Sequence, residues 1–227
     1  MNVHSAAIIM PAASAPHRRS TARTVAIADK RDLLLRAATR VFARNGFFQS
    51  QVADIARVAG VAAGTVYLYF QSKDDLLVSI FERTMREAIA DGRTALEGMA
   101  DPRERLAHIA HLHLERLGRD RDLAVVFQVE LRQSTKFMER FSSTLLQDYL
   151  ALIRDTIALG QQAGVFRSDI SATTSAKIFF GALDEMATNW VLSTRRYRLA
   201  PVADAVVDVF INGVRQGATT TRAQVLR

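Results

Sequence analysis

The sequence predicts an all-α fold in two parts, and three observations point to this class. Apolar residues recur at helical spacing over most of the chain, and no stretch alternates as a strand does. Two short helical patterns meet at a tight break around Gly60. Two long segments near the C-terminus are apolar around most of their circumference, whereas a helix with one solvent-exposed face is apolar on its other face only. We expect a small three-helix domain followed by a larger helical domain.

The composition narrows the possible classes of protein. The chain has 227 residues, no cysteine and a net charge of +7. Without cysteine it forms no disulfide and no thiolate metal site. No apolar run is long enough to cross a bilayer, so we expect a cytoplasmic protein. Residues 1–80 hold ten Lys and Arg but only five Asp and Glu. The basic excess therefore lies in the N-terminal part, as a surface that binds phosphates requires.

Residues 1–27 are predicted to be a disordered N-terminal arm. They lack helical periodicity and contain Pro11 and Pro16. A solvated tail is the favoured interpretation. The alternative is that the arginines of this segment lie along a minor groove, as the arms of other DNA-binding domains do.

Residues 28–75 have the pattern of a helix-turn-helix domain. An amphipathic helix over 29–45 ends at a glycine, and two short helices follow, over 52–59 and 63–70. Two helices joined by a three- to four-residue turn that contains glycine make a helix-turn-helix, whose second helix enters the major groove. We therefore expect the segment over 63–70 to be the recognition helix.

The expected recognition helix displays hydroxyls and phenols rather than the usual charged side chains. Thr65, Tyr67 and Tyr69 lie on its outward side, whereas Val66 and Phe70 look inward. Hydroxyl groups bind phosphate oxygens, and Thr or Tyr also packs on a thymine methyl. The less favoured alternative is that the two tyrosines only pack on the protein surface and do not contact DNA.

A lysine at the start of the next helix adds to this picture. Ser72 is a suitable N-cap, but Lys73 stands where the helix dipole disfavours a cation. A phosphate in front of the helix would explain the lysine, because a helix N-terminus also attracts anions.

These motifs together resemble the DNA-binding domain of the TetR family of bacterial repressors. The resemblance covers roughly residues 30–80 and rests on AGTVYLYF at 63–70 and SKDDLL at 72–77, with upstream FAxxGF and IAxxAGV matches. The family's usual Thr is replaced by Gln51, and Ala53 is short, so the operator sequence stays open. The resemblance implies a homodimer that contacts a palindromic operator through Ser50, Gln51, Ala63, Gly64, Thr65, Tyr67, Leu68, Tyr69 and Lys73.

Residues 76–216 are predicted to form the ligand-binding and dimerisation domain, and residues 217–227 a frayed tail. The first helix, from Lys73 to about Met99, would link the two domains. Asp101 and Pro102 are typical of an N-cap and first helical residue. Further helices are expected over 102–117, 123–137, 141–160, 171–192 and 202–214.

The last two of these helices are predicted to form the dimer interface. A helix that is apolar nearly all round must be covered on both sides, and two such helices cannot both be central in a small monomer. We expect a four-helix interface with a second copy. An internal hairpin in one thick bundle is the alternative.

An apolar pocket is expected between residues 73 and 192, where Phe, Leu and Met are frequent. The stretches at 125–141 and 177–192 resemble the branch of TetR-like repressors that answers to fatty acyl-CoA and controls fatty-acid breakdown. That resemblance implies an acyl tunnel with cations at its mouth, formed by Arg105, Arg116, Phe127, Leu131, Arg132, Lys136, Phe137, Phe166, Phe179 and Trp190. Plain core packing is the alternative for the aromatic residues. A flat hydrophobic drug, as in efflux control, is the alternative effector and would favour buried acids among aromatics.

Other chemistry receives little support from the sequence. His108, His111 and His113 do not share one helix face, and no cysteine stands nearby, so no metal site is expected. Asp184 and Glu185 are adjacent on a helix and point apart, so we interpret them as solvated or interface carboxylates and not as an acid/base pair. No nucleophile or nucleotide-binding motif is present. We expect a repressor without a cofactor, released from DNA by a hydrophobic effector, and not an enzyme. A helical enzyme is the remote alternative.

Overall fold

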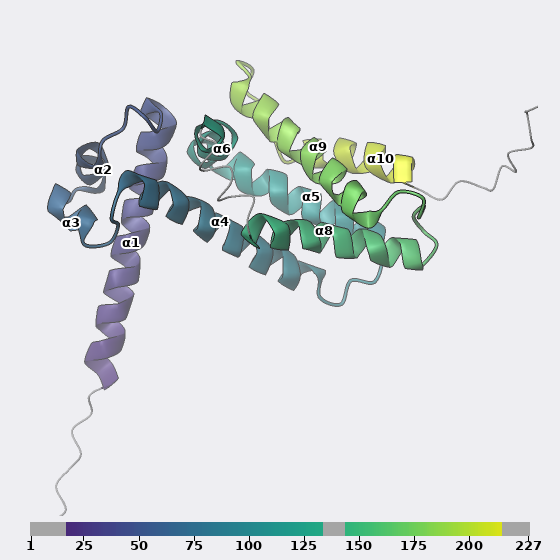
Figure 1. The fold of residues 1–227 in the computed structure, drawn as a ribbon, viewed down its shortest axis with the longest axis horizontal. Coiled ribbons are helices and arrows are strands. Elements are labelled where there is room, and N and C mark those ends of the chain that lie inside the picture. The colour runs from purple at the N-terminus through teal and green to yellow at the C-terminus, as the bar shows by residue number, and fades with distance from the viewer. Residues whose placement is uncertain (1–16, 134–143, 215–227) are drawn as a thin grey trace, which may run out of the picture.

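The computed structural model describes residues 17–133 and 144–214 and confirms the all-α class (Figure 1). No β-strand occurs within those two ranges. The helices are α1 (His17–Asn45), α2 (Val52–Ala59), α3 (Ala63–Tyr67), α4 (Lys73–Leu96), α5 (Pro102–Arg119), α6 (Arg121–Gln128), the 3-10 helix η1 (Glu130–Gln133), α8 (Thr144–Gln162), α9 (Ala172–Leu192) and α10 (Val202–Val214). Among the helices of these ranges, none is both long enough and apolar enough to cross a membrane.

Helix α1 is longer than the sequence pattern indicates. It begins at His17, so the prediction of a disordered arm is wrong for residues 17–27. This segment contains neither Gly nor Pro, so nothing in it stops the helix. A search for apolar periodicity misses this segment, because its apolar residues do not recur at helical spacing along its length. The N-terminal half of α1 extends away from the rest of the protein (Figure 1). Residues 1–16 and the predicted tail at 217–227 lie outside the described residues.

The first three helices pack around one apolar centre, as predicted. Phe42, Ile55, Val66 and Phe70 are almost completely buried there. Gly60 ends α2 with φ 68°, a left-handed conformation that side-chain-bearing residues resist. Helix α3 is shorter than predicted and ends at Tyr67 rather than at residue 70.

The next helix, α4, joins the two domains (Figure 1). Ser72 is its N-cap as predicted, and its hydroxyl oxygen accepts a hydrogen bond from the backbone N–H of Asp75 at 3.1 Å. The side chain of Asp75 in turn accepts from the N–H of Gln71 at 2.9 Å, which fixes the turn after α3. The N-terminal part of α4 packs on α1, and the rest packs on α5 and α8.

The larger domain is a bundle in which α5 contacts α8, α9 and α10. Asp101 caps α5 and Pro102 is its first residue, as predicted. The break expected over 118–122 is limited to Asp120, which separates α5 from α6. The helix expected over 123–137 ends at Gln128 and is followed by η1. The rest of that prediction, with Lys136 and Phe137, falls on residues 134–143, outside the described ranges.

A glycine in α8 carries a packing constraint that can be tested. A Cβ atom at Gly160 would collide with the ring of Phe166, which lies against the helix backbone and is 1% exposed. We expect Gly160→Ala to lower the free energy of unfolding by about 2 kcal/mol, although alanine is the better helix former. Urea denaturation measures the change. Gly64→Ala in α3, outside the predicted dimer interface, is the matched control, because in the described structure nothing beyond its own helix backbone and chain neighbours lies within 4 Å of the position that a Cβ would take there. The control should be neutral or stabilising, and equal effects of both variants would contradict the packing explanation.

Candidate DNA-reading surface and ligand cavity

The surface formed by α2, α3 and the turn between them retains most of the residues predicted to contact DNA. Gln51, Ala63 and Gly64 are exposed. Tyr67 and Leu68 are 57% and 81% exposed, which is far more than their apolar surface favours in water. Thr65 and Tyr69 are half-buried, and Tyr69 also packs against the core. The hydroxyl-and-phenol face is therefore present on the surface, while Val66 and Phe70 point inward as predicted.

Ser50 does not lie on this surface, so the prediction that it contacts DNA is wrong. Its side chain is only 2% exposed. The hydroxyl donates a hydrogen bond to the carbonyl oxygen of Gly46 at 2.6 Å, within the turn between α1 and α2. The short side chain satisfies the backbone of that turn, a common use of serine in place of a surface contact.

Lys73 is also engaged within the protein rather than free for a phosphate. Its Nζ lies 2.9, 3.0 and 3.1 Å from the carbonyl oxygens of Phe47, Phe48 and Ser50. An ammonium group has three donors, and these contacts use all of them. The same nitrogen lies 4.7 Å from the centre of the Phe47 ring. The structure corrects the predicted role of Lys73, which fixes the turn that leads into α2.

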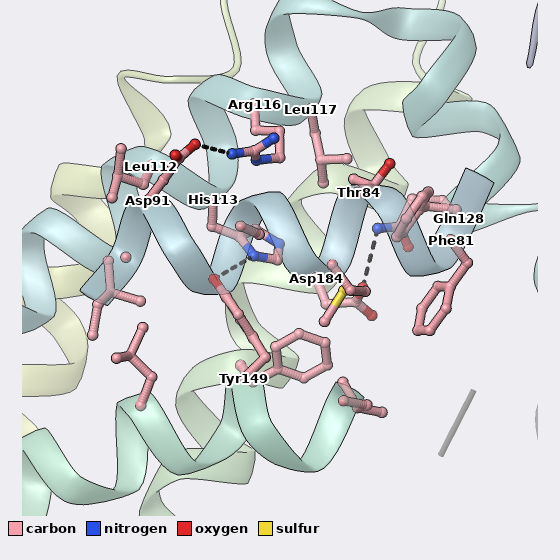
Figure 2. A pocket seen from close by; sticks show the side chains of 18 of the residues that line it. Phe81, Thr84, Asp91, Leu112, His113, Arg116, Leu117, Gln128, Tyr149 and Asp184 are labelled. Atoms are coloured by element: carbon pink, nitrogen blue, oxygen red, sulfur yellow. Dashed lines mark hydrogen bonds and ion pairs between the residues drawn. The ribbon is translucent and has the colours of Figure 1, made fainter. Parts of the chain in front are cut away.

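A cavity of about 290 Å³ lies between α4, α5, α8, α9 and the α6–η1 segment. Most of its lining is apolar, as expected for a site that takes a hydrophobic ligand. The side chains that line it include Phe81, Thr84, Met85, Ala88, Asp91, Leu112, His113, Arg116, Leu117, Phe127, Gln128, Leu131, Arg132, Leu146, Tyr149, Leu152, Phe180 and Asp184 (Figure 2).

Four of the predicted ligand residues lie on this cavity: Arg116, Phe127, Leu131 and Arg132. Arg105 instead donates to the carbonyl oxygens of Leu96 and Met99 and so closes the loop between α4 and α5. The structure does not support the prediction that Arg105 lies at the mouth of the acyl tunnel.

Of the other predicted aromatic residues, the three that the structure describes belong to the core, so the packing alternative holds for them. Phe166 covers Gly160, and the ring of Phe179 lies 4.7 Å from that of Phe210. Trp190 donates through its indole N–H to the carbonyl oxygen of Tyr197 at 2.8 Å.

The charged residues of the cavity wall are paired with one another. Arg116 contacts Asp91 and, at 3.4 Å, Glu87. Arg132 contacts Asp184. The other carboxylate oxygen of Asp184 accepts a hydrogen bond from the side-chain amide of Gln128 at 3.0 Å (Figure 2). The sequence interpretation of Asp184 as a solvated or interface carboxylate is wrong, because its side chain is only 17% exposed and faces the cavity.

His113 and Tyr149 form the polar pair inside the cavity wall. Nδ1 of His113 lies 3.0 Å from the hydroxyl oxygen of Tyr149 (Figure 2). Desolvation by burial lowers the pKa of His113 to about 4, with smaller opposing effects of Asp184, which raises it, and Arg116, which lowers it. Burial also raises the pKa of Tyr149 well above its usual range. Both side chains are therefore neutral at physiological pH.

The pKa of His113 predicts how stability depends on pH. The unfolded chain takes up a proton near pH 6.5, whereas folded His113 stays neutral until about pH 4. Protons therefore favour the unfolded state as the pH falls through this window. Between pH 7 and pH 5, we expect His113 to account for a loss of about 2 kcal/mol in the free energy of unfolding. Urea denaturation at both pH values measures it. In His113→Leu, the loss in the free energy of unfolding between pH 7 and pH 5 should be smaller by this amount. The same pH dependence in the variant and the wild-type protein would show that His113 is not its source.

The three histidines do not converge on one site. His108 is exposed on the surface, and His111 pairs with Asp204 at 2.8 Å. In the part of the chain that the structure describes, no group of three His, Asp or Glu side chains is placed to hold a metal ion.

Tyr149 and Gln128 are cavity residues that the sequence interpretation did not select. Both lie on helices that it identified, and neither belongs to a motif. Their only signal is a polar group within an otherwise apolar helical face, which is too common to identify a binding site by itself.

The comparison with known proteins gives matches over both domains. Residues 34–80 match the family model described as bacterial regulatory proteins, tetR family. Residues 81–213 match the model described as YsiA-like protein, C-terminal region. The fatty acid metabolism regulator protein of Bacillus subtilis is 34% identical over 181 residues, which are 80% of this chain and 93% of the relative.

Two solved structures resemble the whole fold. The fatty acid degradation regulator FadR from Bacillus halodurans has a TM-score of 0.78 at 34% identity, with 83% of this chain and 97% of that chain covered. FadR from Bacillus subtilis in complex with stearoyl-CoA has a TM-score of 0.76 at 34% identity, with 81% and 98% covered.

A helix-turn-helix domain joined by one long helix to a bundle with an apolar cavity defines a DNA-binding regulator with a separate sensor domain. With both domains matched, the chain belongs to the TetR family of bacterial transcriptional regulators.

Proposed function

We propose that this protein is a repressor that binds a palindromic operator as a homodimer and is released by a long-chain fatty acyl-CoA. The observation that carries the proposal is the position of the apolar cavity, which is lined by the same α4 that begins in the DNA-reading domain. The similarity to a fatty acid regulator and to a relative in complex with stearoyl-CoA supports the choice of effector. Control of fatty-acid degradation genes is the corresponding biological role.

The charges of the cavity favour an acyl chain over a cationic drug. A cationic drug requires an unpaired acid among aromatic residues. Among the described residues, the two carboxylates that line the cavity, Asp91 and Asp184, already contact an arginine. The remaining wall is largely apolar, which suits a hydrocarbon chain. Arg116 and Arg132 are partly exposed, at 24% and 42%, and are the candidates to attract CoA phosphates.

The homodimer is proposed to form through α9 and α10. Their outer faces carry apolar side chains that a single chain leaves uncovered: Ile178, Leu192 and Val209 are 56%, 69% and 74% exposed. A two-fold interface built from these helices would set the distance between two recognition helices, which must match half-sites about 34 Å apart or a multiple of this.

Two connections are available to carry the effector signal to the DNA-reading domain. Helix α4 lines the cavity with Phe81 and Met85 and begins at Lys73, which holds the turn before α2. On η1, next to the cavity residue Leu131, Glu130 accepts a hydrogen bond from the backbone N–H of Phe47 at 2.6 Å. A ligand that moves either element would shift that turn, and with it the spacing of the two recognition helices.

Displacement from DNA tests the effector. Palmitoyl-CoA is titrated into a fluorescent protein–operator complex, and we expect release at micromolar concentration. Free CoA should not release the operator, and a cationic hydrophobic dye tests the alternative of drug sensing. Ala88→Trp, which fills the cavity, should still bind the operator, but palmitoyl-CoA should not release it. Ala90→Trp on the exposed side of α4 is the matched control and should respond normally. No release of the wild-type complex would remove the acyl-CoA proposal.

A further inference from the structure

One polar atom of the cavity wall has no partner of its own. Nε2 of His113 is buried and makes no hydrogen bond. Among the described side chains, it is the only buried nitrogen or oxygen atom without a hydrogen-bond partner. Buried polar groups in folded proteins almost always have a partner. Because His113 lines the cavity, a bound ligand is the natural source of that partner.

The contact with Tyr149 determines what kind of partner is needed. A neutral imidazole has one donor and one acceptor nitrogen. Tyr149 keeps its proton, and in the described ranges its hydroxyl has no other hydrogen-bond partner than His113. If the hydroxyl donates to Nδ1, both groups are used, and Nε2 carries the imidazole proton. The free Nε2–H is then a donor that requires an acceptor in the ligand.

The surroundings favour an uncharged acceptor. The centre of the Phe180 ring lies 5.8 Å from that of the imidazole, with the two rings perpendicular, and apolar side chains form most of the remaining wall. Asp184 already places a negative charge beside the cavity, where Arg132 and Gln128 hold it, so a second anion there would be repelled. A carboxylate would lose its hydration in such a cavity, whereas a carbonyl oxygen loses much less.

We propose that His113 is a specificity-determining residue whose Nε2–H donates a hydrogen bond to the thioester carbonyl oxygen of the acyl-CoA effector. This inference rests on the proposed function, because it locates one atom of the proposed ligand. Tyr149 is a positioning residue that holds the imidazole ring and its tautomer. Fixing the carbonyl at His113 also fixes how much of the cavity is left for the acyl chain.

The test compares two ligands that differ only at this carbonyl. Palmitoyl-CoA and the thioether S-hexadecyl-CoA have the same chain length and the same CoA, but the thioether lacks the acceptor. Calorimetric titration should show that the wild-type protein prefers the thioester about five- to tenfold. His113→Leu should bind the thioester about five- to tenfold more weakly and the thioether almost unchanged. Tyr149→Phe, which keeps the ring but removes the hydroxyl, should lose part of the preference.

Each outcome bears on a separate claim. Equal affinity of the wild-type protein for both ligands would overturn the role of His113 but leave the acyl-CoA effector intact. An equal loss for both ligands in His113→Leu would mean that the side chain only shapes the cavity. If the wild-type protein binds neither ligand, the proposed function itself fails and the inference fails with it. The wild-type comparison and Tyr149→Phe keep the test decisive even if His113→Leu does not fold.

Discussion

Replacing Tyr67 by alanine is expected to weaken operator binding about 100-fold. Tyr67 is 57% exposed at the end of α3, and its phenol supports no described contact within the fold. One lost contact to a base or phosphate costs about 1–2 kcal/mol, and a symmetric dimer loses it twice. A gel-shift titration on an operator selected from random DNA measures the change. Tyr197→Ala is the matched control, since this tyrosine is 43% exposed in the segment between α9 and α10. Its operator affinity should not change.

The outcome for Tyr67→Ala shows whether the exposed phenol contacts DNA. A variant that keeps its helical circular dichroism and loses operator affinity identifies the phenol as a DNA contact. Unchanged affinity, with the fold intact, would mean that the exposed tyrosine is not used and would count against α3 as the recognition helix.

The second large effect is expected at the proposed dimer interface. Val209→Glu places a carboxylate on α10 at a side chain that is 74% exposed in the single chain. If α10 packs against a second copy, two such charges are buried close to each other, which costs several kcal/mol. We expect a monomer at micromolar concentration in sedimentation velocity and a loss of operator affinity of at least about 100-fold, because one half-site then holds one domain alone.

A control on another helix makes this result specific. Leu159→Glu changes an apolar residue of α8 that is 39% exposed and lies outside the proposed interface. It should remain dimeric and bind the operator normally. Ile178→Glu on α9 should behave like Val209→Glu. A dimer that survives both interface substitutions would mean that the copies associate through a different surface, as the internal-hairpin alternative for α9 and α10 requires.

Local chemistry made much of this fold predictable. Ser72 and Asp101 cap their helices as the sequence indicates, and Gly60 takes the left-handed conformation expected at the break. Helix α10 has the predicted bounds. These features depend on residues within a few positions of one another, so a single sequence contains the necessary information.

The candidate sites were predicted less completely because they depend on three-dimensional distances. Nothing local in the sequence shows that Lys73 reaches back to the turn before α2. The division of aromatic residues between core and cavity is also not local. Phe127 faces the cavity, whereas Phe166 fills the space above a glycine in α8. A cavity is the space that packed helices leave open, so its lining depends on all the helices together.

The hydrogen bond between Glu130 and Phe47 limits how freely the two halves of this regulator can be exchanged. A fragment that ends after α4 would lack the carboxylate that accepts from the N–H of Phe47, and α1 would lose its contact with α6. A charge-assisted hydrogen bond of this kind contributes about 1.5–3 kcal/mol. Chimaeras that join this DNA-binding domain to a foreign sensor domain therefore need an acidic side chain at the position of Glu130. Without it, the turn between α1 and α2 loses this hydrogen bond.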